Sequence, residues 1–135
     1  MLKGLHHIGI AVTDLDLAVR EWVNVTGGKL LHREIVDEQG VEVATIEIGS
    51  LQVELLTPTS DDSPIARFIA RRGTGVHHIA LESDSTAEEL ARLKALGVRL
   101  IDEQPRTGAG DTLIAFVHPA ALSGVLVELV ERKIE

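Results

Sequence analysis

The sequence of 135 residues contains no cysteine. Disulfides, thiolate nucleophiles, iron–sulfur clusters and cysteine-based zinc sites are therefore excluded, and any metal ion must be held by histidine, carboxylate or amide groups. Aromatic residues make up only 2% of the chain, and 21 acidic residues outnumber 13 basic ones. Because nucleic-acid surfaces combine stacking aromatic rings with basic side chains, this balance argues against a nucleic-acid partner.

Long apolar runs are also missing. The runs at 8–12 and 125–127 are far shorter than the ~20 residues that cross a bilayer. The first residues, Met1 to Gly4, show no basic region followed by an apolar stretch and a cleavage site. We therefore expect no membrane partner and a cytoplasmic location. Hydrophobic residues at 44% and charged residues at 25% are typical of one globular domain, 1–135.

Two halves of the chain repeat one pattern. The segment LHHIGI at 5–10 reappears as VHHIAL at 76–81. A helical pattern follows each copy, ending at Gly27 in the first half and running from the Ser85 cap to Gly97 in the second. Short β-branched segments then predict strands at 30–36, 41–48, 52–56, 98–102, 112–117 and 125–130. The sequence thus predicts an α+β fold of two βαβββ modules, 1–60 and 76–135, joined by a linking helix within 61–75.

One histidine of each repeated pair is the better ligand candidate. Side chains alternate between the two faces of a strand. His7 therefore shares a face with the small residues at positions 9 and 11, whereas His6 shares one with bulky aliphatic residues. The same alternation favours His78 over His77. Because small neighbours leave room for a ligand, we take His7 and His78 as candidates.

Glu54 and Glu128 each lie inside an apolar strand, where an unpaired carboxylate is expensive to desolvate. A divalent cation bound by these two carboxylates, His7 and His78 would satisfy all four groups. The mixed nitrogen and oxygen donors suit Co²⁺, Mn²⁺, Ni²⁺, Fe²⁺ or Zn²⁺. Any one of these residues alone is more simply explained as a packed histidine or a solvated glutamate. Their equivalent placement in two modules favours the metal site.

These residues lie in motifs that resemble the vicinal-oxygen-chelate superfamily of glyoxalases, bleomycin-resistance proteins and dioxygenases and, within it, the methylmalonyl-CoA epimerases. The motifs LHHIGIAV at 5–12 and VHHIA at 76–80 recur across the superfamily, and VELLTP at 53–58 also matches. The segments DSPIA at 62–66 and HP at 118–119 with GVLVEL at 124–129 are more specific to the epimerase branch. The resemblance spans nearly the whole chain.

The resemblance implies that the two modules curl one mixed sheet around a metal-centred cavity, in a homodimer. It carries metal-ligand roles over to His7, Glu54, His78 and Glu128, although one epimerase pattern has glutamine at the position of Glu54. It also implies an isomerase that interconverts (2R)- and (2S)-methylmalonyl-CoA. The proton next to the thioester would leave and return through a metal-stabilised enolate, with Co²⁺ as the expected metal in vitro.

Such a reaction needs carboxylates on both sides of the reacting carbon. The resemblance makes Glu128 one candidate catalytic base. Some epimerases carry the other catalytic glutamate at the position that aligns with Val43. Glu47 has the same strand parity as Val43, whereas Glu42 is one place out of register and needs a bulge to reach that face. We therefore rank Glu47 above Glu42, and each has a simpler interpretation as a solvent-facing strand residue.

An acyl-CoA substrate also needs a partner for its phosphates. Arg67, Arg71 and Arg72 form the densest basic group of the chain and are candidate substrate-binding residues. The alternative is that they are surface charges near a helix C-terminus. His118 is a candidate to hydrogen-bond the substrate, or a residue that simply ends a strand.

Three other functions use the same fold. A glyoxalase I-type enzyme acting on a glutathione hemithioacetal would share the ligand set, but the epimerase-like linker speaks against it. A metal-free small-molecule binding protein of the superfamily generally lacks the full ligand set. An extradiol dioxygenase uses two histidines and one carboxylate on iron, in chains that are commonly longer.

Overall fold

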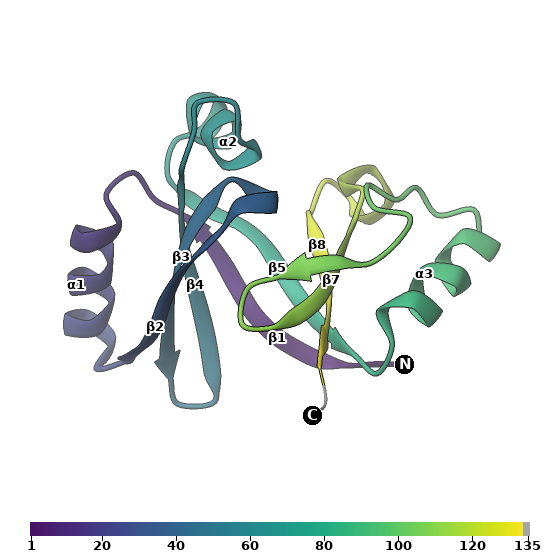
Figure 1. The fold of residues 1–135 in the computed structure, drawn as a ribbon, viewed down its shortest axis with the longest axis horizontal. Coiled ribbons are helices and arrows are strands. Elements are labelled where there is room, and N and C mark those ends of the chain that lie inside the picture. The colour runs from purple at the N-terminus through teal and green to yellow at the C-terminus, as the bar shows by residue number, and fades with distance from the viewer. Residues whose placement is uncertain (134–135) are drawn as a thin grey trace. The chain divides into compact units, whose positions relative to one another are not determined.

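A computed structural model of the chain describes residues 1–133 (Figure 1). Residues 134–135, the expected end of the second module, lie outside the described residues. The elements are β1 (Leu2–Ala11), α1 (Leu15–Thr26), β2 (Lys29–Val36), β3 (Val41–Ile48), β4 (Leu51–Pro58), α2 (Pro64–Arg72), β5 (Gly75–Ser83), α3 (Thr86–Ala95), β6 (Arg106–Gly108), β7 (Thr112–Val117) and β8 (Val127–Arg132). No helix within residues 1–133 is long and apolar enough to cross a membrane.

The chain forms two compact units, His7–His77 and a second that combines Met1–His6 with the chain from His78 onward. The first unit contains strands in the order β2-β3-β4-β1, with β1 parallel to β4 and the other pairs antiparallel. Helix α1 lies against this sheet (Figure 1), and Leu15 and Ala18 pack on Ile46 and Leu55. One face of the sheet is therefore buried under a helix, as the alternating pattern of the strands requires.

Local sequence signals set the ends of the helices in this unit. Asp14 caps α1 by accepting a hydrogen bond from the Leu17 backbone N–H at 3.1 Å. Gly27 ends the helix in the left-handed conformation at φ +70°, which glycine adopts without a steric penalty. Ser63 caps α2, with Pro64 in its first turn. The predicted linking helix is thus confirmed.

The second unit repeats this arrangement. Its strands follow the order β5-β8-β7-β6, with β5 parallel to β8 and antiparallel pairs beyond. Helix α3 begins at the predicted Ser85 cap, whose hydroxyl accepts from the Glu88 N–H at 3.2 Å. Leu90 of α3 packs on Ala115 and Leu129. Both modules are βαβββ, so the predicted α+β class is confirmed.

The second strand of this unit in chain order lies later in the chain than predicted. Within 98–102, only Leu100 forms a β-bridge, with Val117, and the strand is instead β6. The Asp102 carboxylate accepts from the Phe116 backbone N–H at 2.8 Å, while the N–H groups of Ile101 and Asp102 both donate to the Phe116 carbonyl. A side chain thus replaces a ladder partner and interrupts the pairing.

The last strand also begins two residues later than predicted, at Val127. The backbone N–H of Gly124 donates to Pro119, and that of Val125 donates to Leu122. These bonds keep 124–125 in a turn that follows a short 3-10 helix (Pro119–Leu122), so this stretch cannot join the sheet.

Candidate metal centre

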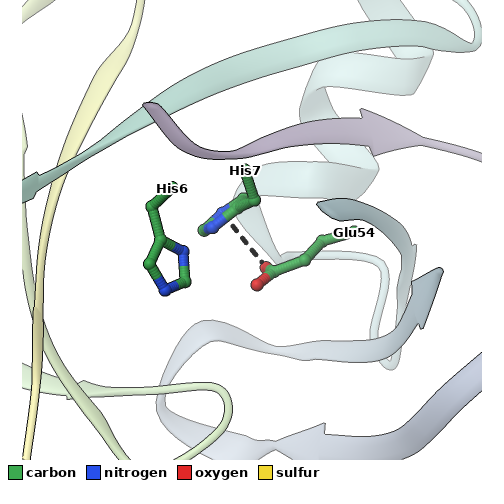
Figure 2. Close-up of side chains that lie close together, drawn as sticks. All are labelled: His6, His7 and Glu54. Carbon is green, nitrogen blue, oxygen red and sulfur yellow. Dashed lines mark ion pairs between the residues drawn. The ribbon is translucent and has the colours of Figure 1, made fainter. Parts of the chain in front are cut away.

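The first unit pairs an imidazole with a carboxylate on two neighbouring strands. Gly9 of β1 is the register partner of Glu54 of β4, and His7 lies two residues before Gly9 on the same face. His7 Nε2 and Glu54 Oε1 are 3.2 Å apart, and Figure 2 shows the two side chains pointing toward one another. His7 is 3% exposed and Glu54 is 8% exposed. The pair therefore lies in the protein interior.

His6 also lies close to this pair in Figure 2, although strand alternation assigned it to the opposite face. Its ring offers a nitrogen within 4.8 Å of the ligand atoms of His7 and Glu54. The pairing between β1 and β4 begins at Ile8, so the alternation enforced by that ladder starts after His6. The sequence pattern missed His6 as a neighbour for this reason.

The second unit contains the same arrangement. Ala80 of β5 is the register partner of Glu128 of β8, and His78 lies two residues before Ala80. His78 Nε2 and Glu128 Oε1 are again 3.2 Å apart. His78 is 5% exposed and Glu128 is 4% exposed. The duplication noted in the sequence therefore extends to the geometry of both pairs.

Small residues make room for each pair, and the cross-strand neighbours differ. Gly9 and Ala80 are the register partners of the two glutamates, so the residue beside each carboxylate is small. Thr45 is the antiparallel partner of Glu54, whereas Phe116 is the partner of Glu128. Sequence reasoning missed both neighbours because only the register of paired strands identifies them.

The donor atoms of each pair fit a divalent metal ion. Each unit brings one imidazole nitrogen and one carboxylate oxygen together among buried apolar residues. A buried carboxylate needs a cation or several hydrogen bonds, and mixed nitrogen and oxygen donors suit first-row transition metals and Zn²⁺. Each pair therefore supplies donor atoms of the kind that bind a divalent ion.

The two candidate second bases lie on opposite faces of β3. The register of β3 with β4 is continuous from Val41 to Ile48, so no bulge turns Glu42 toward Glu54. Glu42 instead accepts a hydrogen bond from Arg33 Nη2 at 3.0 Å. Glu47 is exposed and lies on the same face as Glu54, near the end of the strand. Of the two, Glu47 has the orientation that the sequence argument required.

Arg33 also binds Asp16 of α1, with Nη1 2.6 Å from Asp16 Oδ1. This hydrogen bond and the charge of the guanidinium lower the pKa of the Asp16 carboxyl from its usual value. The pKa of Arg33 is raised by its hydrogen bonds to Asp16 and then Glu42. This network ties the helix to the sheet on the side away from Glu54.

The three candidate arginines lie on α2, and all are exposed. Arg67 Nη1 donates to the Asp62 carbonyl at 2.6 Å. The Arg72 guanidinium lies over the Phe68 ring, 6.0 Å from its centroid, while Arg71 lies in the last turn of the helix. All three side chains are accessible to solvent, so they can bind the phosphates of a substrate or serve only as surface charges of the helix.

His118 follows the last residue of β7 and caps the short 3-10 helix. Its Nδ1 accepts a hydrogen bond from the Ala120 backbone N–H at 3.0 Å. A nitrogen that accepts this bond carries no proton, so the neutral ring has its proton on Nε2. His118 therefore lies at the end of a strand, which was one of the two interpretations. Its Nε2–H is still able to donate a hydrogen bond to a substrate, which was the other interpretation.

Comparisons with known proteins identify the family of this chain. Residues 6–116 match the Glyoxalase/Bleomycin resistance protein/Dioxygenase superfamily. An ethylmalonyl-CoA/methylmalonyl-CoA epimerase from Cereibacter sphaeroides is 34% identical over 131 residues, which are 96% of this chain and 98% of that protein.

Two crystal or complex structures are similar over nearly their full length. Methylmalonyl-CoA epimerase from Mycobacterium tuberculosis superposes with a TM-score of 0.95 at 38% identity, covering 98% of this chain and 90% of that chain. A methylmalonyl-CoA epimerase in complex with methylmalonyl-CoA and NH4+ gives 0.94 at 37% identity, covering 98% and 96%. The chain therefore has the glyoxalase-like fold and belongs to the glyoxalase/bleomycin resistance protein/dioxygenase superfamily and, within it, to the methylmalonyl-CoA epimerase family.

Proposed function

We propose that His7, Glu54, His78 and Glu128 together hold one divalent metal ion that serves an epimerase reaction. The chain is an isomerase that interconverts (2R)- and (2S)-methylmalonyl-CoA, the activity that its family membership supports. The observation that carries the metal site is the duplicated pair, buried in both modules with the same 3.2 Å separation. Co²⁺ is the ion we expect to support activity in vitro, with Mn²⁺, Ni²⁺, Fe²⁺ and Zn²⁺ as alternatives.

The reaction removes the proton from the carbon between the thioester and the carboxylate and returns it on either face. A divalent ion supplies Lewis-acid stabilisation of the negative charge that develops on the carbonyl oxygen. Glu128 is the base we propose for one face, because its carboxylate lies in an interior that excludes water. Glu47 is our candidate for the other face. Glu42 is the weaker candidate, because Arg33 holds it on the far side of the sheet.

The remaining contacts of the substrate are also proposals. Arg67, Arg71 and Arg72 are the groups we expect to meet the phosphates of the coenzyme, because guanidinium groups bind phosphate through paired hydrogen bonds. The Nε2–H of His118 is the donor we expect to face the substrate. We further propose one domain over 1–135, a homodimer and a cytoplasmic location, which sedimentation velocity and cell fractionation would test.

The test of the function is proton exchange with solvent. Purified protein loaded with Co²⁺ is incubated with (2R)- and (2S)-methylmalonyl-CoA in D2O, and deuterium at the α-carbon is measured by NMR. We expect exchange in both epimers, crossover between them and loss of both when the metal is chelated. Absence of exchange in protein with stoichiometric metal would contradict the epimerase function.

The same preparation separates the alternatives. A glyoxalase I-type enzyme would convert the hemithioacetal of glutathione and leave the malonyl thioester unexchanged. A binding protein would retain no stoichiometric metal and would exchange neither compound. Bound metal is measured on the same preparation, so a lack of exchange by protein that holds stoichiometric metal cannot be caused by missing metal.

A further inference from the structure

Arg106 is a further charged residue on the sheet face that carries His78 and Glu128 in the second module. Arg106 of β6 is the register partner of Ile114, which in turn is the partner of Val130. Because residues opposite one another and residues two apart on a strand share a face, Arg106 lies on the same face as Phe116 and Glu128. This edge-strand arginine is thus directed to the face that carries the His78 and Glu128 pair.

Ring contacts connect Arg106 to that pair. The Arg106 guanidinium carbon lies 5.7 Å from the centroid of the Phe116 ring. The Phe116 ring makes an edge-to-face contact with His78, with centroids 5.6 Å apart and planes at 87°. A single phenyl ring therefore separates the cation from the imidazole.

Asp102 forms an ion pair with the inner nitrogen of the Arg106 guanidinium, without a hydrogen bond to it. Arg106 Nε lies 3.2 Å from Asp102 Oδ1, while Asp102 Oδ2 accepts from the Phe116 backbone N–H. Within residues 1–133, neither Arg106 Nη1 nor Arg106 Nη2 donates a hydrogen bond. The side chain is 32% exposed, so these two nitrogens can meet a ligand. Two parallel N–H donors on a fixed plane match a carboxylate.

The first module has the opposite charge at the equivalent position. Val43 lies two residues before Thr45, as Ile114 lies two before Phe116, and the partner of Val43 on β2 is Glu34. Since the two modules otherwise repeat the same His and Glu pair, the arginine is specific to the second. Because the arginine is present in only one of the two modules, it indicates a role other than metal binding, which both modules share.

We propose that Arg106 binds the free acyl carboxylate of the substrate and so selects carboxylated acyl thioesters. This inference rests on the proposed epimerase function and names the group that recognises its substrate. Asp102 is proposed as a positioning residue, because its carboxylate forms the ion pair with Arg106 Nε.

The test compares two thioesters that differ by one carboxylate. Kd values for methylmalonyl-CoA and propionyl-CoA are measured by calorimetry on Co²⁺-loaded wild type, Arg106→Gln, Arg106→Lys and Arg99→Gln. Arg99 is an exposed arginine of the same module whose side chain makes no hydrogen bond, ion pair or ring contact among the described residues. Its Gln variant is therefore a control that removes the same charge. Thermal unfolding of each variant verifies the fold.

We expect Arg106→Gln to raise the Kd for methylmalonyl-CoA roughly 10- to 100-fold, the usual effect of losing hydrogen bonds to a charged group. The Kd for propionyl-CoA should change less than about twofold, Arg106→Lys should give an intermediate loss, and Arg99→Gln should match wild type. Asp102→Asn should also give an intermediate loss, because it keeps the acceptor for Phe116 but weakens the hold on Arg106.

Equal losses for both thioesters would overturn the inference, since the contact would then lie on the shared coenzyme or be purely structural. Unchanged affinity for methylmalonyl-CoA would overturn it as well. Either result, obtained while the wild type still exchanges the α-proton, leaves the epimerase function standing. A wild type that exchanges no proton would instead contradict the function, and this inference with it.

Discussion

The two glutamates should respond differently to the same isosteric change, although their surroundings are nearly equal. Glu54 and Glu128 are 8% and 4% exposed, and each carboxylate lies 3.2 Å from an imidazole nitrogen. Glutamine has the same shape and keeps an oxygen ligand, so we expect each variant to fold with a change in unfolding free energy below about 1.5 kcal/mol. Any difference in activity must then come from the chemistry of the residue.

Glu128→Gln removes a proposed base, whereas Glu54→Gln removes only the charge of a ligand. Loss of a general base lowers rates about 10²- to 10⁴-fold, which corresponds to a barrier raised by about 2.7 to 5.4 kcal/mol. We expect exchange by Glu128→Gln to fall into this range and exchange by Glu54→Gln to stay within about tenfold of wild type.

The assay is the initial rate of deuterium incorporation by NMR, with bound Co²⁺ measured on the same samples by elemental analysis. Metal content separates a lost ligand from a lost base, because a variant that holds metal but does not exchange has lost the base. Equal losses in the two variants at equal metal content, or full exchange by Glu128→Gln, would refute the assignment of the base.

Three further predictions concern binding and stability. Co²⁺ at 100 times its Kd should raise the free energy of unfolding by about 2.7 kcal/mol in a urea titration, and His78→Ala should lose most of this increment. Gly108→Ala should destabilise the protein by about 1–3 kcal/mol, because a Cβ there would lie 2.6 Å from an Ile114 methyl carbon; an unchanged urea midpoint would contradict this packing. The pKa of Asp16 should lie below 3.8 in an NMR titration and rise toward that value in Arg33→Gln. The stabilisation from this pair is present above pH 3.8 and is lost as the pH falls through the lowered pKa; an unchanged Asp16 pKa would refute the pairing.

The repeated sequence motifs made it possible to predict the order of helices and strands in both modules and the two pairs of histidine and glutamate. Each motif appears twice, and strand alternation identified His7 and His78 as the residues that contact Glu54 and Glu128. The boundaries of 41–48 and 112–117 were also predicted correctly, because glycine and aspartate turns flank these β-branched runs.

The prediction of a strand at 98–102 was wrong because local propensity does not reveal long-range side-chain contacts. Val98 to Ile101 favour a strand by composition, but Asp102 bonds the backbone of Phe116 and displaces the pairing to β6. Sequence reasoning missed Arg106 for the same reason. Its place on the face of Glu128 follows from the register of β6, β7 and β8, which no repeat in the sequence encodes.

Duplication accounts for the repetition of the proposed ligands and for the different residues proposed to recognise the substrate. A metal ion accepts equivalent ligands from two equivalent modules, so selection can keep the same pair in both. Methylmalonyl-CoA has a thioester on one side of the reacting carbon and a carboxylate on the other, so equivalent modules cannot bind both groups equally well. The residues that recognise it must differ between the halves. The two modules differ in this way at two positions. The cross-strand partner of the glutamate is Thr45 in the first module and Phe116 in the second. The edge strand carries Glu34 in the first module and Arg106 at the equivalent position of the second.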